Sequence, residues 1–292
     1  MIDFNRIPSH IRLEPRGGAR RKRMLTDSQM QEFNKRGFLK AGRVMSDKNA
    51  DELRERLFDV MEGRSSRSPD ANRNMGGAER VVVQIVNIFQ ADDLFNEHIH
   101  NPAICEMAAQ LMRTETVRVW HDQVQYKPPL KGGTNDWHQD HPYWPIIQPA
   151  DLVSAWVALD DATIENGCMS MVVGSHLWGP HKGGTIGTDP VTFAPMPDLS
   201  LLPKDAIIEI EPCEVKKGEV MFHHCLTWHG SPVNKSAKGR PAIAVHYMPG
   251  HTRYVPEGRT HLVERHITVA PGEILKGEHF PTVWENGKST RS

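Results

Sequence analysis

Three residues have the types and spacing of a metal site. The segment Trp137-His138-Gln139-Asp140 places an imidazole and a carboxylate two positions apart. On a β-strand, residues i and i+2 point to the same face, so His138 and Asp140 should reach one point. A second imidazole, His229, follows far downstream and precedes Gly230-Ser231. Two imidazoles and one carboxylate on one face of a metal leave positions open, as in non-heme Fe(II) oxygenases. We therefore predict a metal site built from these three residues.

One further residue makes this pattern more specific than a His-x-Asp pair, which random sequence often produces. Arg240 stands eleven residues after His229 and precedes the apolar, strand-like run Pro241-Ala242-Ile243-Ala244-Val245. We expect Arg240 on the strand 241–248 or just before it, paired beside the strand that carries His229. This combination resembles the phytanoyl-CoA dioxygenase family of Fe(II)/2-oxoglutarate oxygenases. Other segments resemble that family in the same order: Leu25 to Leu39, Lys127-Pro128-Pro129, Trp156, Glu165 to Met169 and Gly174-Ser175-His176. The resemblance extends from about Leu25 to about Met248.

The resemblance implies both the cofactors and the roles of the site residues. His138, Asp140 and His229 would hold Fe(II), with 2-oxoglutarate and O2 as cosubstrates and succinate and CO2 as products. Arg240 would hold the far carboxylate of 2-oxoglutarate, because a planar guanidinium can donate two parallel hydrogen bonds to it. Ser231 would place its hydroxyl on the same carboxylate.

Further contacts are expected along the strand 115–127 and from two tryptophans. Gln125 and Lys127 share one face of that strand, which should point into the barrel. Polar groups in such an interior are costly unless a ligand or a hydrogen-bond network satisfies them. We predict that Gln125 and Lys127 contact the cosubstrate. Trp156 is expected to form a wall of the cosubstrate pocket, and Trp144 a wall on the iron or substrate side.

The chain has sixteen histidines, so alternatives to the triad need weighing. His223 and His224 precede the distal motif, but neither is followed by Gly-Ser or by an arginine eleven residues later. His121 stays open between a core histidine and a pocket residue. A structural zinc site would need four Cys or His ligands. The four cysteines are not spaced for one, and each is expected to be buried and reduced: Cys105, Cys168, Cys213 and Cys225.

The elements that must position these residues are mostly short strands behind a helical start. We expect helices from Thr26 to about Gly37, from about Ser46 to Glu62, and from Asn101-Pro102 onward, with a strand over 81–89. The remaining strands are expected at roughly 115–127, 137–141, 152–158, 168–173, 206–211, 219–222, 226–229 and 241–248. This pattern predicts a mostly β fold with a helical shell around a double-stranded β-helix, the cupin-like jelly roll.

The chain is expected to hold one oxygenase domain, residues 25–292, behind a flexible basic arm, residues 1–24. The long polar stretch 63–80 is expected to be an irregular loop that acts as a mobile lid. The Gly- and Pro-rich stretch 179–203 is expected to be an insert between barrel strands. Aromatic residues near the motifs favour a substrate with apolar bulk: Trp137, Tyr143, Trp144, Trp178 and Trp228.

Bulk composition limits the partners. With 35 basic and 36 acidic residues, the formal net charge is −1, which gives no global attraction to nucleic acid or an anionic membrane. No stretch has the apolar core of a signal peptide or the length of a membrane span. We expect a cytoplasmic monomer or homodimer that acts on a small molecule.

The function that these observations favour is an Fe(II)/2-oxoglutarate-dependent dioxygenase. It would hydroxylate, or otherwise oxidise, a small metabolite or natural-product intermediate. Asp140 argues against halogenation, because the resemblance implies a small residue at that position in halogenating members. The alternatives are a non-catalytic metal-binding jelly roll and a cupin-type metal-dependent isomerase or hydrolase, which would not need Arg240.

Overall fold

The computed structural model describes residues 24–76, 80–181, 202–203 and 206–291. The predicted basic arm, apart from its last residue, and most of the predicted insert 179–203 lie outside the described residues.

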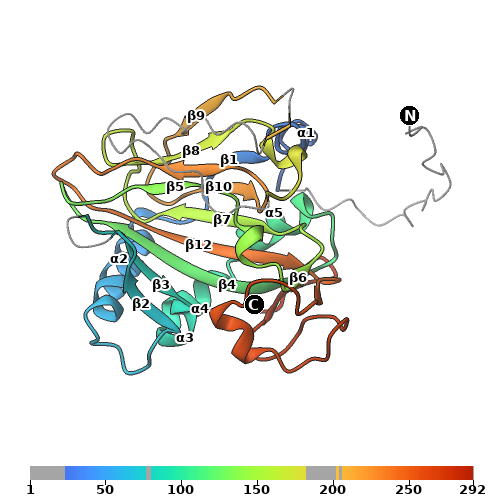
Figure 1. Cartoon of the computed structure of the whole chain (residues 1–292). Coiled ribbons are helices and arrows are strands. Elements are labelled where there is room, and N and C mark those ends of the chain that lie inside the picture. The colour runs from blue at the N-terminus through green and yellow to red at the C-terminus, as the bar shows by residue number, and fades with distance from the viewer. Residues whose placement is uncertain (1–23, 77–79, 182–201, 204–205, 292) are drawn as a thin grey trace.

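Two antiparallel sheets face each other and form the jelly roll that the sequence predicts (Figure 1). Among the described residues, the larger sheet has nine strands in the order β1-β10-β7-β12-β4-β14-β15, with the hairpin β2–β3 joined to β4 through β3. Its strands are β1 (Phe38–Arg43), β2 (Ala71–Asn74), β3 (Val83–Val86), β4 (Thr116–Lys127), β7 (Val153–Ala158), β10 (Glu219–His224), β12 (Arg240–Pro249), β14 (Thr282–Glu285) and β15 (Lys288–Ser289). The smaller sheet has the order β5-β11-β8-β9. Its strands are β5 (Asn135–His138), β8 (Met169–Val172), β9 (Ile210–Cys213) and β11 (His229–Ser231). A separate pair joins β6 (Ile147–Gln148) to β13 (Arg253–Tyr254).

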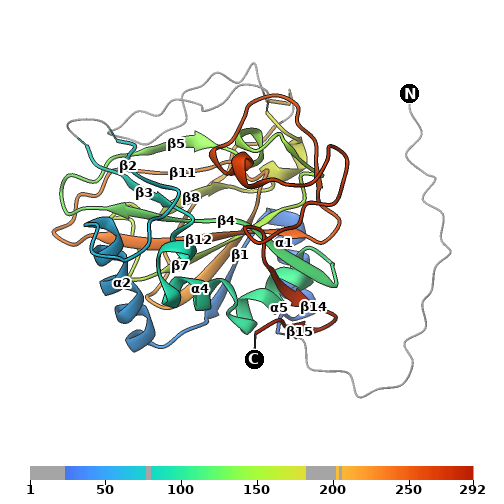
Figure 2. The same ribbon diagram turned by 90° about the horizontal axis from the view of Figure 1, so that it is seen from below.

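The helices cover the outer face of the larger sheet. They are α1 (Asp27–Arg36), α2 (Asp47–Met61), α3 (Ile88–Ala91), α4 (Asp93–Ile99) and α5 (Pro102–Leu111). Figure 2 shows α2, α4 and α5 on the side of that sheet that faces away from β5, β8 and β11. None of the described helices is both long and apolar enough to cross a lipid bilayer.

Alternation along the strands decides which side chains face the helices and which face the site. On β12, Ile243 and Val245 pack into the core beneath the helices, whereas Ala242 and Ala244 pack between the two sheets. On β10, Phe222 faces the helices and Met221 the interior in the same way. Because side chains alternate with period two, the polar residues of these strands that share the inner face meet in one place.

Local signals explain the helices that the sequence predicts. Thr26 and Gln29 form a reciprocal capping box at the start of α1, and Ser46 and Asn101 cap α2 and α5. Gly37 ends α1 with φ of +81°, and a Cβ at that position would lie 2.5 Å from the His176 ring. Any larger residue there would therefore meet both backbone strain and a collision.

Several strand boundaries differ from the predictions. The strand expected over 81–89 is short, because the chain turns at Asn87, which has φ of +56°, and begins α3 at Ile88. The strands expected at 206–211 and 226–229 begin later, as β9 and β11. The stretch 63–80 is not wholly irregular, because residues 71–74 form β2 and pair with β3. Its movement on substrate binding stays a prediction.

All four cysteines are free and buried, as expected.

Candidate active site

The structure brings His138, Asp140 and His229 together at one point between the sheets. His138 ends β5 and pairs directly with His229, which begins β11. Oδ1 of Asp140 lies 3.7 Å from Nε2 of His138 and 3.6 Å from Nε2 of His229. The three ligand atoms all lie within 4.8 Å of one another, a separation that one metal ion can bridge.

The backbone position of Asp140 differs from the prediction that it lies on the same strand as His138. The strand β5 stops at His138, and Asp140 adopts helical backbone angles at the start of η1 (His141–Tyr143). The Asp140 carboxylate therefore reaches the cluster from a turn that follows β5. Contrary to the prediction, Asp140 and His138 are not on the same face of one strand.

The two imidazoles have the tautomer that a metal requires. Nδ1 of His138 lies 2.7 Å from the carbonyl of Asp136, and Nδ1 of His229 lies 2.9 Å from the carbonyl of Thr227. A carbonyl only accepts, so each Nδ1 carries the proton and each Nε2 offers its lone pair to the cluster. Burial, followed by the nearby His138, holds the pKa of His229 well below its usual range, which keeps it neutral. This donor set suits Fe(II).

The second oxygen of Asp140 is held by residues of the larger sheet that the sequence did not single out as site residues. His223 on β10 donates from Nε2 to Oδ2 at 3.0 Å, and the hydroxyl of Ser154 on β7 donates to the same atom at 3.1 Å. Ser154 also lies 2.7 Å from Nδ1 of His246 on β12. Burial opposes ionisation of Asp140, but its electrostatic interaction with His229 and the hydrogen bond from His223 outweigh it and hold the pKa of Asp140 well below its usual range. The carboxylate is thus ionised, with Oδ1 left for a metal.

An inner pocket begins at this cluster and runs between the sheets. The predicted residues Gln125, Trp156 and Ser231 line it, together with His223, His229 and His246 among others. Gln125 accepts a hydrogen bond of 2.7 Å from the amide of Asn135, which fixes its side chain. The small residues of β12 leave this space open, and Ala244 lines it.

Arg240 lies next to Trp156, a residue of the pocket lining, and is a buried cation without a hydrogen-bond partner among the described residues. Its side chain has 0% exposure, and none of its three guanidinium nitrogens has a hydrogen-bond partner among the described residues. It does not itself line the pocket, but its guanidinium carbon lies 5.4 Å from the ring centroid of Trp156, which does. Burial lowers its pKa to about 10, so it stays charged at neutral pH. A buried, unpaired charge is costly, and a dicarboxylate reaching from the metal would satisfy it.

The structure corrects the predicted neighbour of Arg240 and places Lys127 beside it. Arg240 was placed beside the strand of His229, but β12 pairs with β4 and β7, so the two residues belong to opposite sheets. Lys127 pairs with Arg240 in register and is also fully buried. Its Nζ donates to the Ser231 hydroxyl at 2.6 Å and to the Pro232 carbonyl at 2.6 Å. Lys127 thus holds Ser231 in place, and its direct contact with a cosubstrate stays a prediction.

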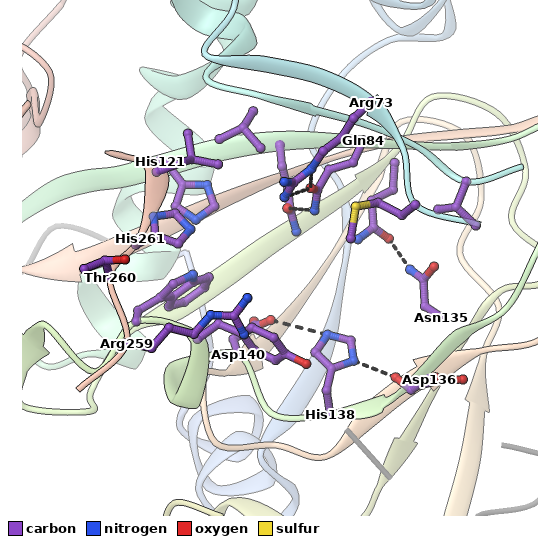
Figure 3. A pocket seen from close by; sticks show the side chains of 18 of the residues that line it. Arg73, Gln84, His121, Asn135, Asp136, His138, Asp140, Arg259, Thr260 and His261 are labelled. Carbon is purple, nitrogen blue, oxygen red and sulfur yellow. Dashed lines mark hydrogen bonds and ion pairs between the residues drawn. The ribbon is translucent and has the colours of Figure 1, made fainter. Parts of the chain in front are cut away.

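A larger outer cavity of about 380 Å³ opens on the other side of the cluster (Figure 3). Its lining includes His138 and Asp140, the predicted wall Trp144, and His121, which the sequence left undecided. Of the aromatic residues expected to surround a substrate, only Tyr143 and Trp144 line it. Trp137 and Trp228 instead pack together in a separate apolar cluster.

A jelly roll that gathers two histidines and one carboxylate beside a buried, unpaired arginine has the construction of a non-heme iron oxygenase. The sequence matches the phytanoyl-CoA dioxygenase family over residues 33–242, and the chain belongs to that family. It therefore shares the cofactors of this family, Fe(II), 2-oxoglutarate and O2.

Individual proteins agree with this assignment. A Caenorhabditis elegans protein described as a probable phytanoyl-CoA dioxygenase is 26% identical over 280 residues, covering 87% of this chain and 86% of that protein. The crystal structure of SnoK, a non-heme alpha-ketoglutarate-dependent carbocyclase from nogalamycin biosynthesis, is 26% identical with a TM-score of 0.71. The match covers 88% of this chain and 96% of SnoK. The epimerase SnoN from the same biosynthesis has the same TM-score at 21% identity, which supports the fold alone; 88% of this chain and 97% of SnoN are covered.

Proposed function

We propose that this protein hydroxylates, or otherwise oxidises, a small metabolite or natural-product intermediate. The observation that carries the proposal is the buried guanidinium of Arg240, which has no hydrogen-bond partner among the described residues and lies against Trp156, in the wall of a pocket that also contains His138, Asp140 and His229. A metal-binding protein without catalysis, or a cupin-type isomerase or hydrolase, has no use for such a cation.

Each residue then has a defined part. His138, Asp140 and His229 hold Fe(II) through Nε2, Oδ1 and Nε2. Arg240 holds the far carboxylate of 2-oxoglutarate, and Ser231 assists with a hydroxyl that Lys127 orients. Gln125 and Trp156 shape the wall of the same pocket. When bound, Fe(II) and 2-oxoglutarate supply the activation of O2, coupled to oxidative decarboxylation to succinate and CO2.

The outer cavity receives the substrate. Trp144 and Tyr143 form part of its wall, and the cluster lies at its inner end (Figure 3). Its volume of about 380 Å³ is within the range typical of sites for small organic molecules. Because Asp140 supplies a carboxylate to the metal, no position is freed for a halide, so oxidation rather than halogenation is the proposed outcome.

The test is succinate production from 2-oxoglutarate by the purified protein with Fe(II) and O2, in the presence of a panel of candidate metabolites. The expected result is succinate together with a candidate that gains one oxygen or loses two hydrogens. Asp140→Asn should abolish both and weaken Fe(II) binding, because a neutral amide replaces an ionised ligand. The matched control is Asp151→Asn, an exposed carboxylate away from the cavity. Full activity of Asp140→Asn would overturn the proposal.

A further inference from the structure

Two arginines project into the outer cavity from separate segments. Arg73 comes from β2, and Arg259 comes from the stretch between β13 and η4 (Leu262–His266). Figure 3 shows them on different sides of the space above His138 and Asp140. Both residues are exposed, so their charges are accessible to a molecule that enters the cavity.

Neither guanidinium has a carboxylate within ion-pair distance among the described residues. Arg73 donates from Nε and Nη2 to the amide oxygen of Gln84, at 3.0 and 2.8 Å. Arg259 lies over the ring of Tyr143, with its guanidinium carbon 5.2 Å from the centroid. By contrast, the nearby Arg64 pairs with Asp59, and Arg265 pairs with Asp70. Neutral contacts position Arg73 and Arg259 without cancelling their charge.

Both charges act on the same part of the cavity. His261 lines it, and its pKa falls to about 4 because of burial first and then the neighbouring His246, Arg73 and Arg259. His121 on the same wall has its pKa lowered to about 3, chiefly by burial. The imidazoles are therefore neutral at pH 7, and the positive charge of this wall comes from the two arginines.

The inner and outer parts of the site differ in charge balance. With both cofactors bound as proposed, the charges of Fe(II) and Arg240 are matched by those of Asp140 and the two carboxylates of 2-oxoglutarate. Burial and Arg240 lower the pKa of the remaining base there, Lys127, well below its usual range. Among the described residues that line the outer cavity, Asp136 is the one carboxylate besides Asp140, against two arginines, Arg73 and Arg259. One positive charge thus remains in the space that the substrate enters, and a singly charged anion would balance it.

A buried acceptor adds a second feature to the recognition surface. Nδ1 of His121 lies 3.2 Å from the carbonyl of Asp122, so this nitrogen carries the proton. Its Nε2 is buried and has no hydrogen-bond partner among the described residues. A hydroxyl or N–H group of a ligand in the cavity would satisfy it.

We propose that the substrate carries an oxyanion, such as a carboxylate or phosphate, which binds to Arg73 and Arg259, and a hydrogen-bond donor that reaches His121. The inference rests on the proposed function, since it assigns a substrate class to the same site. It replaces the expectation of a mainly apolar substrate with a polar, anionic one.

The test compares acids with their neutral amides on the protein loaded anaerobically with Fe(II) and saturating 2-oxoglutarate, so that the inner pocket is filled. The probes are 3-phenylpropionate, 3-phenylpropionamide and phenyl phosphate. Relaxation of probe protons by the paramagnetic iron reports binding near the cluster. We expect both anions to bind at least about tenfold more tightly than the amide, as for a charge-assisted contact.

Variants test whether Arg73 and Arg259 cause the preference for anions. Arg73→Gln and Arg259→Gln should each reduce the preference for anions, and the double variant should remove it. The matched control, Arg253→Gln, loses an exposed arginine of the same C-terminal segment outside the cavity and should keep the preference. Equal binding of acid and amide to the wild type, absence of binding by both anions, or an unchanged preference in the double variant would overturn the inference.

The same samples separate this result from a failure of the proposed function. Fe(II) and 2-oxoglutarate binding are measured on each variant before the probes are added. A wild-type protein that binds both cofactors and forms succinate, but does not discriminate acids from amides, contradicts the inference alone. A wild-type protein that fails to bind 2-oxoglutarate contradicts the proposed function itself.

Discussion

Arg240 combines complete burial with an unsatisfied guanidinium, and a folded protein tolerates that combination only where a ligand supplies the missing acceptors. The pairing of Arg240 with Lys127 in register places two basic side chains side by side. Burial and the charge of Arg240 together lower the pKa of Lys127 well below its usual range. The proposed cosubstrate would relieve this unfavourable concentration of charge.

Replacing Arg240 should therefore act on 2-oxoglutarate and leave the metal alone. Losing a buried, charge-assisted contact typically costs about 2–5 kcal/mol. Arg240→Ala should raise the dissociation constant of 2-oxoglutarate by about tenfold or more, while Fe(II) binding stays nearly intact. Arg240→Lys keeps the charge but not the two parallel donors, so an intermediate loss is expected. An unchanged 2-oxoglutarate constant in the alanine variant, measured by calorimetric titration, would rule out this role.

His223 gives a second prediction, because it fixes the oxygen of Asp140 that faces away from the metal position. Removing such an outer hydrogen bond typically costs about 10–100-fold in metal affinity. His223→Phe should weaken Fe(II) binding by that order, and His223→Gln, which can still donate, should recover part of it. The adjacent His224 points the other way and bonds to the backbone of Leu226, so His224→Gln is the matched control. Equal Fe(II) affinities of the wild type and His223→Phe would contradict the positioning role.

Residue types alone were enough to predict the metal cluster, but not the residues around it. The spacing of the imidazoles, the carboxylate and the guanidinium in the sequence is enough to indicate a metal site and a carboxylate-binding residue. His223, Ser154 and His246 come from three different strands, and their meeting depends on the register of β10, β7 and β12. That register is set by long-range pairing, which a single sequence does not display. His223 has the residue type of a metal ligand, but its position makes it a hydrogen-bond partner of the ligand Asp140.

At the scale of elements, the outer cavity depends on two segments that are distant in sequence. The hairpin β2–β3 carries Arg73, and η4 is preceded by Arg259 and His261. Asp70, just before β2, joins them: its carboxylate accepts hydrogen bonds from Arg265 at 2.7 Å and from His266 at 2.8 Å. The Asp70 carboxylate therefore links the start of the hairpin to η4.

Asp70→Asn should weaken that link. The Asp70 side chain is 6% exposed, and hydrogen bonds to a charged group contribute about 1.5–3 kcal/mol each, so we expect a loss of about 2 kcal/mol in the free energy of unfolding. Burial opposes ionisation, but bonds from Asn87, Arg265 and His266 keep the pKa of Asp70 below its usual value. The ionised form therefore stabilises the fold above the unfolded pKa of about 3.9, and this contribution is lost as pH falls through the lower folded pKa.

The measurement is urea unfolding of wild type and variant across pH. The difference between them should be largest near pH 7 and shrink below about pH 4. Asp93→Asn provides the control, because Asp93 pairs with Arg67 at the surface with 87% of its side chain exposed. An exposed pair contributes at most about 1 kcal/mol. A pH-independent difference for Asp70→Asn would exclude the electrostatic explanation.

Elements with local signals were predictable, and those defined by tertiary contacts were not. The helices α1, α2 and α5 begin at side chains that cap their own first turns, and these residues can be read directly from the sequence. The edge strand β1 follows Gly37 with only two fully buried residues, Phe38 and Leu39, and its pairing with β10 cannot be seen locally. The same holds for β2, whose polar sequence ANRN gave no strand pattern.

At the scale of the whole molecule, the sequence indicates a jelly roll but does not show which of the two sheets carries each site residue. Eight short strands with turn residues between them predict the architecture. Some strand partners are far apart in the sequence, and the pairing of β12 with β4 joins residues more than a hundred positions apart. The strand of Arg240 was therefore placed next to the strand of His229, when the two lie in opposite sheets.

That division has a thermodynamic consequence. Two of the three proposed metal ligands, His138 and His229, belong to the smaller sheet, and Asp140 directly follows its strand β5, whereas Arg240 belongs to the larger sheet. A molecule bound to the metal at one end and to Arg240 at the other therefore links the smaller sheet to the larger sheet. Binding should accordingly be ordered, metal before 2-oxoglutarate, and the two should raise the melting temperature under anaerobic conditions by more than the sum of their separate effects. Additive shifts in the melting temperature would mean that ligand binding does not further stabilise the contact between the two sheets.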